Sequence, residues 1–396
     1  MKTVLLLFIA ILFMSGLCLK AQSGSEKRTL KVINLSGSNY EMGFQHGQQL
    51  KSEIDQVIVK WKQNIANNFN GNADSILHEF FEYAHFMHAI QKYAPELLEE
   101  VKGIAAGSGQ NFEDMLGLNL MDEYWVYLNN KQNGVESHHC TCVGVPASKT
   151  HPAYLAQNMD IEKYLDGYQV LMRISANGNR PEQLIFTFPG CLGLNGLNNN
   201  SIASCENTVL QLKASNEGLP VMFVVRRIIG STNKDELLKF IQTVPHASGQ
   251  NYMIGIGNAI FDFEASSNKV VRLFPETENG VVTHTNHPLL NDDAKPWYAE
   301  FDPKLNQKHE GNNSCIRLES AQHNMGKSPE ISDQTIKAAL RATDDPSNAV
   351  CRSLSNNGRS YTFGSTIMTL GENPSLQITS GPPNESEYKT FTFTEK

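Results

Sequence analysis

The chain has 396 residues, with 33 Lys and Arg residues against 41 Asp and Glu residues, which gives a formal charge of -8. This acidic balance excludes the basic footprint of a nucleic-acid-binding protein. With 40% hydrophobic and 19% charged residues and no low-complexity tract, the composition is typical of a globular protein with a large core, and it excludes a disordered or fibrous chain.

The first segment has the pattern of a secretory signal peptide. Lys2 precedes an apolar run over residues 4–14, which is shorter than the about 20 apolar residues that cross a bilayer. We therefore predict a signal peptide over residues 1–21, cleavage after Ala21, a secreted or periplasmic location and no membrane span. A lipoprotein anchored at Cys18 is the alternative, although the preceding Leu17 is a poor residue for that processing.

The next hundred residues have helical patterns after a short strand-like run over 30–35. Ser38 and Glu41 have the spacing of a capping box, which predicts the start of a helix that reaches about Asn67. Pro95 and Asn111 are favourable first and capping residues for two later helices, and Gly107 is expected to end the first of these. The further predicted helices cover 75–93, 95–106 and 111–129.

Near Gly134 the pattern changes to short apolar runs bounded by Gly, Pro or Asn, which predict strands. The predicted strands cover 141–145, 153–159, 168–174, 183–188, 192–197, 202–206, 251–256, 260–265, 270–274, 280–284, 361–370 and 376–379. Helical patterns interrupt them at 220–230, 233–244 (after Thr232 as a cap), 314–325 and 332–342. Helices that flank a large, mostly antiparallel sheet predict an α+β layered fold.

The segment NGVESHHCTCVGV, residues 133–145, is the most informative place in the chain. In one interpretation Cys140 and Cys142 are ordinary strand residues, free to pair with later cysteines in an exported chain. In a second, thiolates and imidazoles hold Zn²⁺, with a loose spacing and no C-x-x-C motif. In a third, Cys140 is a nucleophile at the edge of a sheet. The zinc ligands would come from His138 or His139, Cys140, Cys142, His284 and His287.

Several short motifs, taken together and in this order, resemble the acyl-coenzyme A:6-aminopenicillanic acid acyltransferase family of N-terminal-nucleophile amidohydrolases, which is related to the choloylglycine hydrolases. The resemblance extends over nearly all of the chain that follows the signal segment. The motifs are Tyr40-Glu41-Met42-Gly43 with His46-Gly47, residues 94–100 with 103–107, Leu118-Asn119, Cys140-Thr141, residues 157–160, Gly196-Leu197-Asn198 leading to Asn207, and residues 284–288.

The resemblance implies an αββα four-layer fold and a precursor that cuts itself before its nucleophile. Cleavage between His139 and Cys140 would give a helical segment, residues 22–139, and a core, residues 140–396, which stay associated. The new α-amino group would serve as the base, and its pKa of about 7.7 to 8.0 lies close to the about 8.5 of a free thiol. Cys140 supplies both groups, whereas Cys142 would be no chain terminus.

The same resemblance assigns roles to three further residues. Asp160, which closes Gln157-Asn158-Met159-Asp160, would orient the α-amino group of Cys140. Asn286 would donate to the oxyanion of the transition state, and Asn207 would be a second amide at the site. The choloylglycine hydrolases have Arg where Gln157 stands here, which puts conjugated bile acids in doubt as substrates. Spacing alone favours Asp160 as a residue that ends a strand before a turn over residues 164–167, and Asn207 could equally be a turn residue.

The sequence therefore predicts an exported cysteine amidohydrolase that cleaves an N-acyl amide of small size, with no cofactor and no metal. An acyltransferase that passes the acyl group to an amine is one alternative. A secreted binding protein that has lost catalysis is another, because His139 stands where small residues are frequent in the family. The sequence leaves open the acyl group, the amine, the disulfide pairing and the presence of a homo-oligomer.

Overall fold

The structure is a computed structural model that describes residues 28–132, 139–275, 279–296, 298, 313–328, 330–356 and 358–393. The predicted signal peptide lies outside the described residues. Residues 133–138, which directly precede the predicted cleavage position, also lie outside them. Within these ranges, no helix combines the length and the apolar character that a bilayer crossing needs.

Two stacked sheets form the centre of the molecule. One sheet has eight strands in the order β1-β4-β5-β6-β7-β8-β9-β10, and all neighbours are antiparallel except β1 and β4. The strands are β1 (Lys31–Leu35), β4 (Val170–Ile174), β5 (Gln183–Thr187), β6 (Asn195–Asn198), β7 (Ile202–Thr208), β8 (Gln250–Ile256), β9 (Ala259–Ala265) and β10 (Val270–Leu273).

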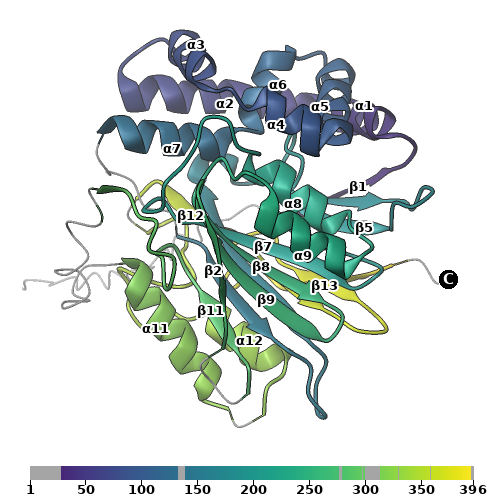
Figure 1. Cartoon of the computed structure of the whole chain (residues 1–396), viewed down its shortest axis with the longest axis vertical. Helices are drawn as coiled ribbons and strands as arrows, with labels where there is room; N and C mark the ends of the chain where they lie inside the picture. The colour runs from purple at the N-terminus through teal and green to yellow at the C-terminus, as the bar shows by residue number, and fades with distance from the viewer. Residues whose placement is uncertain are drawn as a thin grey trace, which may run out of the picture.

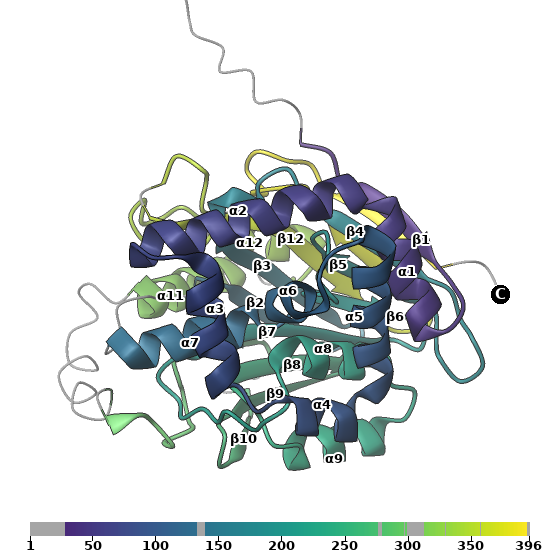
Figure 2. The same cartoon turned by 90° about the horizontal axis from the view of Figure 1, so that it is seen from above.

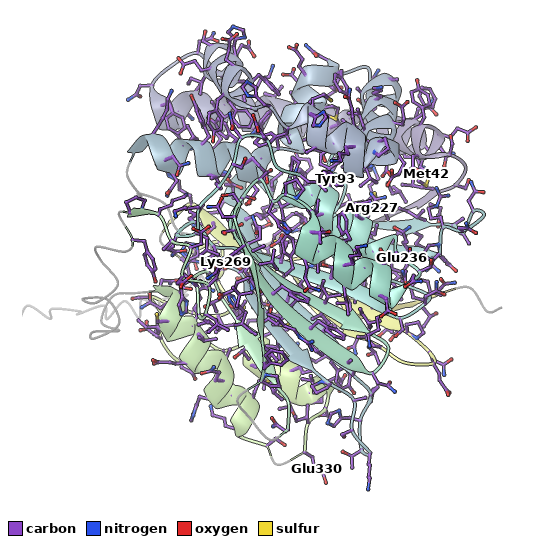
Figure 3. All side chains as sticks on the ribbon, in the orientation of Figure 1. Met42, Tyr93, Arg227, Glu236, Lys269 and Glu330 are labelled. Atoms are coloured by element: carbon purple, nitrogen blue, oxygen red, sulfur yellow. The ribbon has the colours of Figure 1, made fainter. Side chains whose placement is uncertain are left out.

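The second sheet has six antiparallel strands in the order β11-β2-β3-β12-β13-β14. The strands are β11 (Val282–His284), β2 (Thr141–Val145), β3 (Tyr154–Glu162), β12 (Ser360–Thr369), β13 (Ser375–Ile378) and β14 (Lys389–Thr392). The rings of Phe186 in the first sheet and Phe363 in the second stack with centroids 5.2 Å apart, so the sheets pack face to face. Side chains fill the space between the layers (Figure 3).

Helices cover both outer faces of this pair of sheets (Figure 1). The helices α8 (Val221–Ile229) and α9 (Lys234–Thr243) cover the eight-stranded sheet, and α8 contacts β6 and β7. On the other side, α11 (Asn313–Gly326) contacts β2 and β11, and α12 (Asp333–Leu340) contacts β3 and β12. The predicted α+β fold of four αββα layers is therefore confirmed.

A layer of seven helices from the N-terminal part lies above the sheets in Figure 1 and is seen from above in Figure 2. The helices are α1 (Asn39–Gln49), α2 (Lys51–Phe69), α3 (Ala73–Tyr83), α4 (Met87–Tyr93), α5 (Pro95–Ser108), α6 (Phe112–Leu118) and α7 (Met121–Gln132). The capping box of Ser38 and Glu41 is present at the start of α1. Because β1 pairs with β4, the N-terminal part also contributes an edge strand to the core.

The glycines of the first family-like motifs lie where α1 and α5 touch. A Cβ atom on Gly43 would collide with the carbonyl of Glu100, and one on Gly107 would collide with the carbonyl of Phe44. Gly107 is therefore needed for close helix packing. It does not end the helix, which continues to Gly109, whose left-handed backbone (φ 79°) forms the C-cap.

Several predicted element boundaries are wrong. The pattern up to Asn67 is two helices, because the backbone of Leu50 leaves the helical region, and 75–93 is likewise two helices. The cap of α9 is Asn233 instead of Thr232, since the Asn233 side chain accepts from two backbone amides of the first turn. Strand β14 was not predicted, because its short polar sequence has no apolar alternation.

Candidate active site

A cavity of about 520 Å³ lies between the N-terminal helical layer and the two sheets, next to Cys140. Its apolar lining comes mainly from α7 and from the strands, and its polar lining includes acids and arginines. The lining residues are Met121, Asp122, Trp125, His139, Cys140, Met159, Asp160, Ile161, Glu162, Leu194, Glu206, Thr208, Met222, Asn313, Ser347, Arg352, Gly358, Arg359 and Ser360. Residues from both sides of the predicted cleavage position thus meet in one cavity.

Cys140 directly precedes β2 and is only 4% exposed. The backbone N–H of Asp160 donates to its Sγ atom at 3.4 Å, and Met159 Sδ lies 3.7 Å from the same sulfur. Burial raises the pKa of the Cys140 thiol well above its usual value, and the charges of Glu206 and Asp160 raise it further. The thiol is therefore neutral at pH 7 in the uncut chain.

Asp160 lies on β3 beside a β-bulge, since Asp160 pairs with Thr362 and Met159 with Gly364 of β12. A bulge turns a side chain away from the regular alternation of a strand. Both carboxylate oxygens are buried and neither has a well-aligned hydrogen bond among the described residues, although the side chain of Thr362 lies close enough to lower the pKa of Asp160. Arg352 Nε forms an ion pair with Oδ2 at 3.8 Å. Burial raises the pKa of Asp160 to about 7, although the charge of Arg352 opposes this shift.

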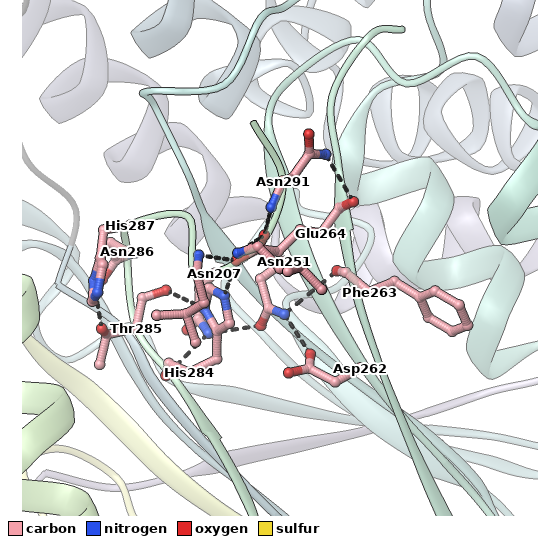
Figure 4. A network of polar contacts seen from close by, with 12 residues as sticks. Asn207, Asn251, Asp262, Phe263, Glu264, His284, Thr285, Asn286, His287 and Asn291 are labelled. Atoms are coloured by element: carbon pink, nitrogen blue, oxygen red, sulfur yellow. Dashed lines mark hydrogen bonds and ion pairs between the residues drawn. The ribbon is translucent and has the colours of Figure 1, made fainter. Parts of the chain in front are cut away.

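Cys142 and Asn207 lie together beneath the cavity and do not line it. Cys142 Sγ lies 3.3 Å from Asn207 Oδ1, and Asn207 Nδ2 donates to Asn251 Oδ1 at 3.1 Å and to the carbonyl of His284 at 3.4 Å. Figure 4 shows Asn207 within this polar network. Its role as a second amide at the site stays a prediction, since both of its amide hydrogens are already donated.

Asn286 follows β11 and is buried, but it does not line the cavity. Its Nδ2 donates to the carbonyl of Thr208 at 3.0 Å, and its Oδ1 accepts from Arg317 Nη2 at 2.9 Å. One N–H of the carboxamide is left for another acceptor. The arginine fixes which way the amide points.

The sequence interpretation missed three polar residues near Cys140. Glu206 lines the cavity because β7 alternates, so Glu206 and Thr208 face it while Asn207 faces away. Burial raises the pKa of Glu206 well above its usual value. Arg352 precedes β12, and Arg317 lies on α11 and contacts the chain at His139 and Cys140. No local motif marks either arginine, because both reach the site from distant helical and loop segments.

The other interpretations can be compared with the same geometry. In the part of the chain that the structure describes, no group of three or more His, Cys, Asp or Glu side chains could hold a metal ion. His284 Nε2 donates to Glu264 Oε1 at 2.8 Å, and His287 Nδ1 lies 2.8 Å from Ser314 Oγ. Gln157 bonds Asn195 and the carbonyl of Glu206, so it joins the two sheets and does not line the cavity. The six described cysteines are all buried free thiols.

Comparison with known proteins identifies the family. The model of the acyl-coenzyme A:6-aminopenicillanic acid acyl-transferase family matches residues 148–383. The chain belongs to this family. It is thus an enzyme of the amide hydrolase and acyltransferase class, and the resemblance seen in the sequence is confirmed. The matched range includes Asp160, Asn207 and Asn286 and begins after Cys140.

Two relatives illustrate the similarity. The chain is 24% identical over 273 residues to the acyl-coenzyme A:6-aminopenicillanic-acid-acyltransferase 40 kDa form of Emericella nidulans, covering 68% of this chain and 72% of that protein. It is 24% identical over 313 residues to protein dcd1A of Dictyostelium discoideum, covering 68% of this chain and 66% of that protein.

Solved structures with a similar arrangement include a penicillin V acylase from Agrobacterium tumefaciens, at 13% identity and a TM-score of 0.41, covering 65% of this chain and 86% of that one. The Caenorhabditis elegans ortholog of N-acylethanolamine-hydrolyzing acid amidase matches at 15% identity and a TM-score of 0.40, covering 64% of this chain and all of that one.

Proposed function

We propose that this protein is an exported cysteine amidohydrolase that cuts its own chain between His139 and Cys140. The thiol of Cys140 is then the nucleophile, and the new α-amino group of the same residue is the base. Asp160 orients that amine, and Asn286 donates to the oxyanion. The products of self-cleavage are residues 22–139 and residues 140–396, which remain together because the helical layer and the sheets share one core.

The observation that carries the proposal is the carboxylate of Asp160. It is buried beside Cys140, where only a 3.8 Å ion pair with Arg352 and the Thr362 side chain oppose the cost of its burial. A buried carboxylate that is only partly compensated is costly. Cleavage before Cys140 would place an ammonium group next to it, which supplies the missing donors and a compensating charge.

The same cleavage would activate the thiol. In the uncut chain the nitrogen of Cys140 is a planar amide, which is not a base; it becomes basic only when attack makes the carbonyl carbon tetrahedral. As a free amine it titrates near 8, close enough to a thiol for proton transfer at neutral pH. The thiolate would attack the carbonyl carbon of the substrate amide. The amine of the substrate would then leave, taking the proton held by the α-amino group of Cys140, and water would hydrolyse the thioester.

The cavity supports a substrate that has both an apolar and an anionic part. Met121, Trp125 and Met159 supply apolar surface, and Arg359 supplies positive charge at the same cavity beside the acids Asp122 and Glu162. Burial raises the pKa of the two other lining acids, Asp160 and Glu206, and so reduces their negative charge. The cavity volume of about 520 Å³ is in the usual range for small-molecule sites. An N-acyl amino acid fits this description. A panel of N-acyl amino acids and their methyl esters tests it, and equal rates on acids and esters would contradict it.

Hydrolysis and acyl transfer differ only in what attacks the thioester. The family is described by an acyl-transferase activity, which favours transfer as the second candidate. The ratio of acid to amide product in the presence of an added amine separates the two. A product ratio that does not respond to the amine concentration supports hydrolysis.

The decisive experiment for a catalytic role uses a thiol-directed substrate analogue on purified protein. We expect the label on Cys140 and loss of amide hydrolysis in step with labelling. A protein that binds the amide without turnover and is not labelled would be the binding protein of the same fold. N-terminal sequencing of exported protein, which should begin at Gln22, tests the proposed signal peptide separately.

A further inference from the structure

Arg317 is buried against the peptide bond where cleavage is proposed. Its Nη1 donates to the carbonyl oxygen of His139 at 2.7 Å and to the carbonyl oxygen of Cys140 at 2.5 Å. The same nitrogen lies 3.1 Å from Thr141 Oγ1. The oxygen of His139 is the one that would become negative if the thiol of Cys140 attacked the preceding carbonyl carbon.

Two further hydrogen bonds hold the guanidinium in this position. Its Nε donates to Asn313 Oδ1, one helical turn away on α11, at 2.7 Å. Its Nη2 donates to Asn286 Oδ1 at 2.9 Å. The side chain is fully buried, so its orientation is fixed before any reaction begins. Donors that are fixed in advance stabilise a developing charge without the cost of reorganisation.

We propose that Arg317 is a catalytic residue of self-cleavage, which holds the His139 carbonyl for attack and stabilises the oxyanion that forms on it. The inference rests on the proposed function and extends it, because it assigns a residue to the maturation step. It also links maturation to catalysis, since the same guanidinium orients the carboxamide of Asn286.

The reaction balances with water as the one co-reactant. Cys140 Sγ bonds to the carbonyl carbon of His139, and the thiol proton passes to the nitrogen of Cys140. The C–N bond then breaks and leaves a thioester between His139 and Cys140 with a free α-amine. Water hydrolyses the thioester, giving a carboxylate on His139 and restoring the thiol.

Arg317 acts here as a donor and not as a base. Burial lowers its pKa to about 10, and the neighbouring Asp160 and Cys140 oppose this shift. The guanidinium is therefore still protonated at neutral pH and can keep donating throughout the reaction.

The test follows self-cleavage of the full chain over time in a cell-free translation reaction, with the loss of full-length protein as the readout. Arg317→Met removes every donor and keeps an unbranched side chain, and Arg317→Lys keeps the charge with a single donor nitrogen. Arg226→Lys is the matched control, because Arg226 is equally buried but pairs with Glu100 away from the cavity. Thermal unfolding of each variant, in a Cys140→Ala background, measures its stability.

We expect Arg317→Met to slow cleavage by about 10²- to 10³-fold, as the loss of an oxyanion donor does elsewhere. Arg317→Lys should recover part of this rate, and Arg226→Lys should cleave at the wild-type rate even where it lowers the unfolding temperature.

Three outcomes would overturn the assignment. Wild-type rates in both Arg317 variants overturn it while leaving self-cleavage intact. If Arg317→Lys and Arg226→Lys have equal stability and lose the same cleavage rate, the assignment is overturned as well, because the loss of rate would then be a structural effect. A wild-type chain that never cleaves overturns the assignment together with the proposed maturation. If Arg317→Met does not fold, the two lysine variants decide alone.

Discussion

Two buried carboxylates, on opposite sheets, have contrasting surroundings. Glu264 on β9 accepts from His284 Nε2 at 2.8 Å and from the backbone amides of Leu289, Leu290 and Asn291. Although burial raises its pKa, the bonds from His284 and the backbone lower it overall. Asp160 on β3 has no well-aligned hydrogen bond within the described ranges, and burial raises its pKa to about 7 although Arg352 and Thr362 oppose this.

The difference separates a group that stabilises the fold from a group prepared for chemistry. Glu264 and His284 fix the loop that follows β11, and this loop carries Asn286. Asp160 has only the 3.8 Å ion pair with Arg352 and the nearby Thr362 side chain to offset its burial beside the neutral thiol of Cys140. An unsatisfied buried acid is retained only where something compensates its cost. The new amine of Cys140 is the compensation that we propose, and the following changes test this contrast.

The largest effect should come from the two cysteines on the same strand. Cys140→Ala should abolish self-cleavage and amide hydrolysis together, because it removes the only group that performs both attacks. Cys142→Ala should keep substantial activity, since Cys142 contacts Asn207 beneath the cavity. Gel analysis and hydrolysis assays on both variants check this. The reverse order of effects would move the nucleophile two residues along the strand.

Glu264→Gln should reduce stability, and it should affect the chemistry only through the loop that carries Asn286. It breaks a fully buried ion pair, which typically costs about 3 to 5 kcal/mol. Because the pKa of Glu264 is lowered in the folded state, its contribution is present at neutral pH and is lost as the pH falls through that lowered value. Denaturant unfolding of both proteins in a Cys140→Ala background should therefore show a difference that shrinks in acid. A constant difference would argue against the ion pair.

Asp160→Asn should have the opposite effect on stability in the uncut Cys140→Ala chain. The raised pKa means that the wild-type carboxyl is favourable below about pH 4 and loses that contribution as the pH rises to about 7. The substitution should therefore stabilise the uncut chain at pH 8, by up to about 4 kcal/mol, and much less at pH 4. Unfolding at the two pH values checks the sign. In a Cys140-containing chain the same substitution should shift the pH profile of the first half-reaction.

Asn286→Ala should lower kcat and kcat/KM by similar factors of about 10²- to 10³-fold, with KM little changed. The reason is that the Asn286 amide would stabilise a charge that exists only in the transition state. The same substitution should also slow self-cleavage. Steady-state kinetics on cleaved protein measure the first effect. A near wild-type kcat would show that Asn286 is only a strand-end asparagine, and Asn207 would then be the next candidate for the oxyanion donor.

Local signals predicted much of the fold. Short apolar runs bounded by Gly, Pro or Asn located most of the described strands closely, and the Ser38 capping box placed the start of α1. The element boundaries that were predicted wrongly depend on contacts between segments far apart in the chain. The sequence pattern predicts that Gly107 ends a helix. Glycine is needed there instead because the carbonyl of Phe44, on a neighbouring helix, leaves no room for a side chain.

The candidate site likewise contains some residues that the sequence predicts and others that it does not. The family motifs led to Cys140 and Asp160, which the fold brings together across two adjacent strands. Alternation on β7 could have directed attention from Asn207 to Glu206, because only every second residue faces the cavity. Arg317 and Arg352 could not be found from the sequence. Each lies far from the nucleophile along the chain and has no motif around it.

The most direct test of the account is the intact mass of purified wild-type protein under denaturing conditions. We predict two chains of roughly 13 kDa and roughly 29 kDa, in proportion to the 44.0 kDa of the whole chain, with the larger one beginning at Cys140. The Cys140→Ala protein should remain one chain. A wild-type protein that hydrolyses amides as a single uncut chain would contradict the proposal that the amine of Cys140 is the base.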